Sequence, residues 1–199
     1  LNEAGGHAVA ALQQEPTAVI ATGMLQAAQA AEVALGAVLR AYRFDKYRTK
    51  EKPEDKPKLA KLTLLASEAT AAKTAWEPLE GVAKGVSLSR DLVSEPPNVL
   101  NPAEMADRCK KLSELGVKVE ILGTREMGRL GFGALLGVAQ GSVNEPRMVV
   151  MQWNGTGNGR KARGKPVAFI GKGVTFDTGG ISIKPAGGME DMKWDMAGA

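Results

Sequence analysis

The sequence predicts an α/β protein in which a mostly parallel central sheet is flanked by helices, preceded by the end of a smaller α/β domain. Two observations lead to this prediction. In the second half of the chain, short apolar runs alternate with helical patterns, as in parallel sheets whose strands are joined by helices. A long helical segment precedes this alternation, and we place the boundary between the two domains near it. The first domain is then residues 1–72 and the second is residues 73–199.

The first domain is predicted to contain a helix, a charged loop and a strand. Residues 17–44 are expected to be helical because apolar side chains recur at three- and four-residue spacing and alanine is abundant. Residues 45–58 are rich in charge and contain two prolines, which is typical of an exposed loop. Residues 61–66 predict a strand.

A long helix is expected to follow, with Ser67 as a candidate cap. It should run to about Val93 and end before Pro96, because proline cannot continue a helix and restricts the residue before it.

The second domain is expected to begin with a helix that Asn101 caps, Pro102 opens and Gly116 ends. A short helix is expected at residues 124–130. Strands are expected at residues 117–122, 134–139, 148–153 and 166–170.

Composition narrows the class of protein. No apolar run approaches the roughly 18 residues of a membrane span, and no signal peptide is visible. The net charge of +4 comes from basic residues that are dispersed or paired with acids, unlike a nucleic-acid-binding patch. The single cysteine, Cys109, excludes an internal disulfide and favours a cytoplasmic location. Its helical surroundings predict an inert, partly buried thiol.

The scarcity of histidine restricts any metal site. With His7 as its only histidine and with one cysteine, the chain cannot build a site from several His or Cys ligands. A catalytic metal would therefore depend mainly on carboxylate oxygens, with an unusual additional ligand.

Charged residues gather after the strand expected at residues 166–170. Gly171 and Gly173 surround Lys172, and glycine lets the backbone approach a ligand closely. Ligands of open α/β sheets bind beyond the carboxyl ends of strands, so a candidate site is expected here. The charged residues that follow are Asp177, Lys184 and Asp195.

A hydrolytic reaction would give each of these residues a role. Asp177 and Asp195 are hard oxygen ligands for divalent metals, and two close metals activate water and stabilise an oxyanion. A neighbouring lysine would bind a metal when neutral, or polarise a substrate carbonyl when protonated.

The same residues also suit roles that involve no metal. Asp-Thr-Gly-Gly at residues 177–180 is equally typical of a simple turn. The phosphate-loop order Gly-x-x-x-x-Gly-Lys-Ser/Thr is absent around Lys172, which disfavours a nucleotide site. Asp195 could be a surface residue at the start of a helix. Composition alone favours packing for the nearby methionines Met189, Met192 and Met196.

The sequence Ile-Gly-Lys-Gly-Val-Thr-Phe-Asp-Thr-Gly-Gly-Ile-Ser-Ile-Lys-Pro at residues 170–185, with residues 189–199 behind it, resembles the leucyl aminopeptidases, or cytosol aminopeptidase family. The match is long and ungapped and includes an unusual lysine ligand. Weaker similarity at residues 42–47, 90–93, 96–98 and 133–142 extends the resemblance over most of the chain.

This resemblance implies a two-metal exopeptidase that releases N-terminal residues, leucine-like ones preferred, from peptides with a free N-terminus. By that likeness Lys172, Asp177 and Asp195 bind the metals, and Asp177 serves both. Lys184 would be the catalytic residue that polarises the scissile carbonyl, and with Met192 it would contact the substrate. The family uses two divalent ions, zinc or manganese, and assembles as a homohexamer of two-domain subunits with a zinc-exopeptidase-like catalytic domain.

One departure from the family pattern matters. The family draws its remaining metal carboxylates, and an arginine that holds bicarbonate, from an Asn-Thr-Asp-Ala-Glu-Gly-Arg segment that this sequence lacks. We therefore expect an internal piece of a cytoplasmic aminopeptidase, with an incomplete catalytic domain that is inactive alone. The alternative is a non-enzymatic DNA-binding or regulatory role. One small basic cluster is relevant to DNA binding, and we expect it to be the tip of a hairpin between strands. It consists of Arg160, Lys161, Arg163 and Lys165.

Overall fold

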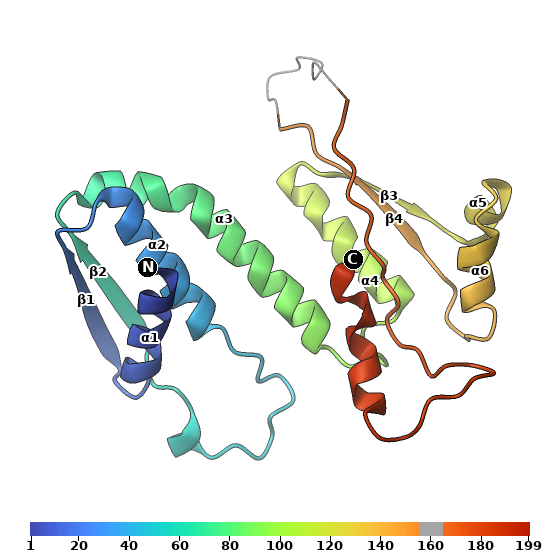
Figure 1. Cartoon of the computed structure of the whole chain (residues 1–199), viewed down its shortest axis with the longest axis horizontal. Helices are drawn as coiled ribbons and strands as arrows, with labels where there is room; N and C mark the ends of the chain where they lie inside the picture. The colour runs from blue at the N-terminus through green and yellow to red at the C-terminus, as the bar shows by residue number, and fades with distance from the viewer. Residues whose placement is uncertain (156–164) are drawn as a thin grey trace. The chain divides into compact units, whose positions relative to one another are not determined.

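The computed structural model describes residues 1–155 and 165–199, which divide into two compact units (Figure 1). The first unit is Leu1–Asp91 and the second is Leu92–Ala199. Each combines helices with strands, which confirms the α/β fold class. The boundary between the units falls inside a long helix, and the domain division between residues 72 and 73 stays a prediction.

The first unit contains a two-stranded parallel sheet (Figure 1). Strand β1 (Thr17–Gly23) pairs with β2 (Lys61–Ala66), and the Thr22 hydroxyl donates to the carbonyl oxygen of Leu65 at 2.8 Å. The helices are α1 (Asn2–Leu12), α2 (Ala27–Ala41), the 3₁₀ turn η1 (Pro53–Asp55) and α3 (Ala69–Ser94), which continues into the second unit.

The prediction of a single helix over residues 17–44 is wrong. Its first residues form β1, because β-branched side chains favour a strand and β2 is available to pair with them. Gly23 has a φ of 48°, which glycine adopts readily, and the strand ends there. Gln26 and Gln29 then begin α2 with a reciprocal capping box.

Two other predictions for this unit are confirmed. Residues 61–66 form β2, and α3 covers the long helix expected up to Val93. The helix begins at Ala69, two residues after Ser67, and ends at Ser94, before Pro96.

Two buried glycines let α1 and α2 approach closely. A Cβ at Gly5 would lie 2.0 Å from the carbonyl oxygen of Val33, and a Cβ at Gly36 would lie 1.8 Å from that of Asn2. No side chain fits at these distances. The packing of this helix pair therefore requires glycine at both positions.

The second unit contains an antiparallel pair of strands, β3 (Lys118–Leu122) and β4 (Met148–Gln152). The capping prediction is confirmed, since the Asn101 side chain accepts hydrogen bonds from the amides of Ala103 and Glu104. The helices are α4 (Pro102–Lys110), η2 (Lys111–Leu115), α5 (Thr124–Arg129), α6 (Gly133–Ala139) and η3 (Met189–Gly198), of which η2 and η3 are 3₁₀ helices.

Two of the expected strands are absent from this unit. Residues 134–139 form α6, because their alanines and leucines are strong helix formers. Residues 166–170 form neither helix nor strand, and Val167, Phe169 and Ile170 are 80%, 93% and 98% exposed. Within the described residues no strand pairs with this run, and an apolar run alone cannot supply the hydrogen bonds of a sheet.

Cys109 is half-buried in α4, and its burial raises the pKa of the thiol. A raised pKa lowers the thiolate fraction at neutral pH, which agrees with the expectation of an unreactive, partly buried cysteine. In the part of the chain that the structure describes, no helix has both the length and the apolar character needed to cross a membrane.

Replacing Gly36 with alanine should destabilise the first unit by about 1–3 kcal/mol, because overpacking forces α1 and α2 apart. Gly81→Ala is the matched control, since open space surrounds the Cβ position of Gly81 in α3. That control should stabilise the helix by about 0.5–1 kcal/mol. Denaturant unfolding followed by circular dichroism measures both, and a Gly36→Ala chain of unchanged stability would contradict the close packing of α1 on α2.

Candidate active site

The loop over residues 177–184 closes on itself through hydrogen bonds. The Gly179 amide donates to Asp177 Oδ1 at 2.7 Å, and the Lys184 amide donates to the carbonyl oxygen of Thr178 at 2.9 Å. Gly179 has a φ of 92°, and a Cβ there would lie 2.1 Å from the carbonyl oxygen of Ser182. Glycine is therefore required at the point where the loop turns back.

This closure brings Lys184 beside Asp177. Lys184 Nζ donates to Asp177 Oδ2 at 3.2 Å and lies 3.1 Å from Met192 Sδ. The Lys184 side chain is 34% exposed, so it contacts both solvent and neighbouring protein atoms.

A second ion pair joins the start of the segment to its end. Lys172 Nζ donates to Asp195 Oδ2 at 2.7 Å, and Asp195 lies on η3. A Cβ at Gly171 would lie 2.4 Å from the carbonyl oxygen of Gly198. The glycine therefore lets the backbone pass directly beside the end of η3, which places Lys172 within reach of Asp195.

Electrostatics connect the two ion pairs. The pKa of Asp177 lies below its ordinary value of 3.8, chiefly because the Gly179 amide donates to the carboxylate and then because Lys184 does. The positive charge of Lys172 lowers the same pKa further. Lys172 thus acts on Asp177 while it pairs with Asp195.

The structure therefore brings all five residues predicted from the sequence into one group, which we call the Lys–Asp cluster. Residues 177–180 are both a turn and part of a site in this geometry, because the turn is what holds Asp177 beside Lys184. The members of the cluster are Lys172, Asp177, Lys184, Met192 and Asp195.

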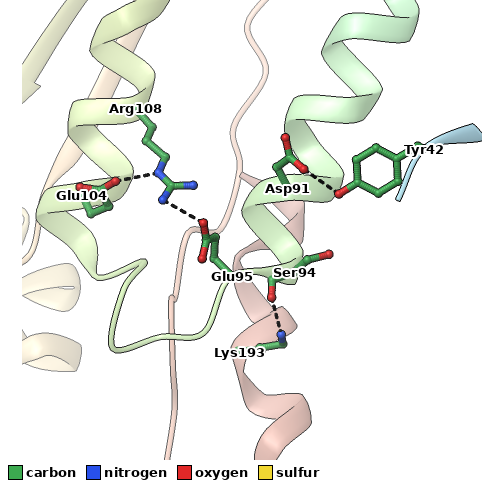
Figure 2. A network of polar contacts seen from close by, with 7 residues as sticks. All are labelled: Tyr42, Asp91, Ser94, Glu95, Glu104, Arg108 and Lys193. Atoms are coloured by element: carbon green, nitrogen blue, oxygen red, sulfur yellow. Dashed lines mark hydrogen bonds and ion pairs between the residues drawn. The ribbon is translucent and has the colours of Figure 1, made fainter. Parts of the chain in front are cut away.

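A network of polar contacts at the end of α3 was not anticipated from the sequence (Figure 2). Glu95 is 4% exposed and accepts from Arg108 Nη2 at 3.1 Å, while Arg108 Nε donates to Glu104 at 2.8 Å. These carboxylates, Glu104 foremost, raise the pKa of Arg108. Lys193 Nζ donates to the carbonyl oxygen of Ser94 at 2.8 Å.

Figure 2 also draws a contact of the first unit, in which the Tyr42 hydroxyl donates to Asp91 Oδ1 at 2.7 Å. Glu104 and Arg108 are four positions apart on α4, whereas the other pairs in this figure join different elements, and no local sequence pattern predicts those pairs.

The cluster fits a divalent metal in the kind of its donors but not in their number. Asp177 and Asp195 offer hard carboxylate oxygens, and Lys172 offers an amine. Across residues 1–155 and 165–199, no three His, Cys, Asp or Glu side chains are grouped so that they could hold a metal ion.

The basic cluster that bears on DNA binding is only partly described. Arg160, Lys161 and Arg163 lie outside the described residues, and only Lys165 lies within them. The expected hairpin tip stays a prediction.

Comparison with known families decides the identity of the second unit. Residues 87–199 match the catalytic domain of the cytosol aminopeptidase family. The chain belongs to the cytosol aminopeptidase family. The matched region contains the whole Lys–Asp cluster, so the resemblance found at residues 170–185 is confirmed at the level of the family.

Members of the cytosol aminopeptidase family are similar to almost the whole chain. A probable cytosol aminopeptidase of Rhizobium etli (strain CIAT 652) is 55% identical over 203 residues, which cover 99% of this chain and 40% of that protein. One from Rhizobium johnstonii is 61% identical over 172 residues, covering 85% of this chain and 34% of that protein. The chain spans about 40% of the length of the first of these relatives.

Solved structures share the fold. A bottromycin maturation enzyme in complex with Mn matches with a TM-score of 0.75 and 31% identity, over 98% of this chain and 40% of that one. A mutant of tomato leucine aminopeptidase matches with a TM-score of 0.76 and 28% identity, over 98% and 38%.

Gly179→Ala should raise the pKa of Asp177 toward 3.8, because a side chain at this position displaces the amide that stabilises the carboxylate. Gly187→Ala is the control, since open space surrounds the Cβ position of Gly187. Carbon-13 NMR of the Asp177 carboxyl carbon during acid titration, in metal-free buffer, measures the pKa.

The sign of the accompanying stability change follows from the lowered pKa. The ionised Asp177 stabilises the folded chain at neutral pH, and this contribution is lost as the pH falls through its folded-state pKa. The Gly179→Ala chain should therefore lose less stability on acidification. An Asp177 pKa that is unchanged in this variant would contradict the assigned role of the Gly179 amide.

Proposed function

We propose that the chain forms part of a metal-dependent aminopeptidase that releases leucine-like N-terminal residues from peptides. The observation that carries this proposal is the gathering of two lysines and two aspartates, within the region that matches the family's catalytic domain. The names of the relatives support peptide substrates with a free N-terminus.

Lys184 would act on the scissile carbonyl of the peptide. Its ammonium group is partly exposed beside Asp177, so it can donate to a carbonyl oxygen and stabilise the negative charge that develops there. Met192, in contact with Lys184, would lie beside the N-terminal side chain of the substrate. A flexible thioether suits an apolar, leucine-like group.

Asp177, Asp195 and Lys172 would supply some of the ligands of two divalent ions, zinc or manganese, with Asp177 shared between them. When bound, such ions polarise the carbonyl and supply an activated water molecule. Lys172 donates to Asp195, so its amine would have to leave this partner in order to bind a metal. The Mn bound to the structurally similar bottromycin maturation enzyme supports a divalent ion at this cluster.

We further propose a cytoplasmic homohexamer of two-domain subunits, in which bicarbonate assists as a base in the complete protein. The name of the family and of its relatives supports the cytoplasmic location. The hexamer and the bicarbonate rest on the resemblance to the family.

Asp177→Ala and Lys184→Ala should each lower kcat for leucine amide hydrolysis by about 10²–10³-fold, because each removes a charge that acts on the reacting centre. The assay uses a protein that joins these residues to the remaining length of the relatives, with added Mn²⁺ or Zn²⁺. Asp107→Ala, an exposed position on α4, should keep full activity. Full activity in both cluster variants would exclude these roles.

The isolated 199 residues should show no peptidase activity, because two carboxylates and one lysine are too few ligands for two metal ions. Hydrolysis of leucine p-nitroanilide with excess Mn²⁺ measures this, and Mn²⁺ affinity is followed by calorimetry. Robust turnover by the purified chain, absent in its Lys184→Ala variant, would show that these ligands suffice.

A further inference from the structure

We propose that Lys193 is a positioning residue that holds Met192 and Asp195 in the Lys–Asp cluster. This inference rests on the proposed function of that cluster. Lys193 lies between these two residues on η3, and its Nζ donates to the carbonyl oxygen of Ser94 at 2.8 Å, across 99 positions of sequence (Figure 2). The side chain thus joins η3 to the end of α3.

The end of α3 favours a cation. Ser94 is the last residue of this 26-residue helix, whose final carbonyl groups lack partners within the helix and carry the negative end of its dipole. The last turn of α3 contains no basic residue of its own. Lys193 therefore supplies both a donor and a positive charge from another element.

The residues that follow α3 are buried and ion-paired, so they are held in place by the rest of the unit. Glu95 follows Ser94 directly, is 4% exposed and is ion-paired with Arg108 of α4. Leu100 and Ala106, which follow within twelve residues of Ser94, are each 2% exposed and belong to the buried core. A contact to Ser94 is thus a contact to a well-packed part of the unit.

The residue that contacts Ser94 and the residues that belong to the Lys–Asp cluster lie on different faces of η3. In a 3₁₀ helix, side chains three residues apart lie on the same face. Lys193 and Met196 share one face, where Lys193 holds Ser94 and Met196 is 3% exposed. Met192 and Asp195 share the next face, where they contact Lys184 and Lys172.

Loss of the Lys193 contact should therefore turn or loosen η3 and withdraw both site residues together. Asp195 would no longer be held within reach of Lys172, although neither residue of that pair is changed. Lys193 acts on the cluster only through this placement.

The test compares Lys193→Met, which removes the donor and the charge, with Lys193→Arg, which keeps both. Lys118→Met is the control, because Lys118 is exposed on β3. Lys193→Met should speed amide hydrogen exchange over Met189–Gly198 about tenfold relative to α4, because a charge-assisted hydrogen bond is lost. It should also shift the Asp195 carboxyl carbon-13 signal and the Lys172 Nζ nitrogen-15 signal away from their paired values.

Lys193→Arg should restore both readouts, and Lys118→Met should change neither. Unchanged exchange and unchanged Asp195 and Lys172 signals in Lys193→Met would overturn the inference, as would equal acceleration of η3 and α4. If Lys193→Met fails to fold, Lys193→Gln takes its place with the same criteria. No metal or substrate enters these measurements, so full leucine amide hydrolysis by the Asp177→Ala and Lys184→Ala variants of the longer protein would overturn the proposed function alone.

Discussion

The candidate site is arranged around the Asp177 carboxylate, which is held at both of its oxygens. Oδ1 accepts from the Gly179 amide and Oδ2 accepts from Lys184, which in turn touches Met192. Hydrogen bonds to the charged form of a carboxylate favour ionisation and fix its orientation. Lys172 adds a second positive charge that lowers the pKa of Asp177, while its side chain pairs with Asp195.

Glycine makes this arrangement possible in a segment without strands. Residues 165–188 contain no regular helix or strand, yet backbone atoms pass closely at Gly171 and Gly179. At each position a Cβ would overlap a carbonyl oxygen of another residue, which lies on η3 for Gly171 and in the same loop for Gly179. The loop owes its shape to these close approaches and to side-chain pairs, and both require particular residue types at particular positions.

The residue order of the site was more informative than the apolar pattern of the fold. The types and order of Lys172, Asp177, Lys184 and Asp195 single them out, the family resemblance implies their roles, and the structure gathers them. Apolar spacing alone failed at residues 17–44, where it could not separate a strand from the helix that follows. It also failed at residues 166–170, since a strand depends on a partner that a local pattern does not reveal.

The difference has a physical origin in sequence separation. Within the cluster, Asp177 and Lys184 are 7 positions apart, Lys184 and Met192 are 8, and Lys172 and Asp195 are 23. All of these partners lie within residues 172–195, so one short stretch of sequence contains the whole cluster. The contact from Lys193 to Ser94 spans 99 positions, and no motif can carry it. The residues of the cluster therefore lie close together in the sequence. The contact that joins the cluster to the rest of the unit depends instead on the packing around the end of α3 and α4.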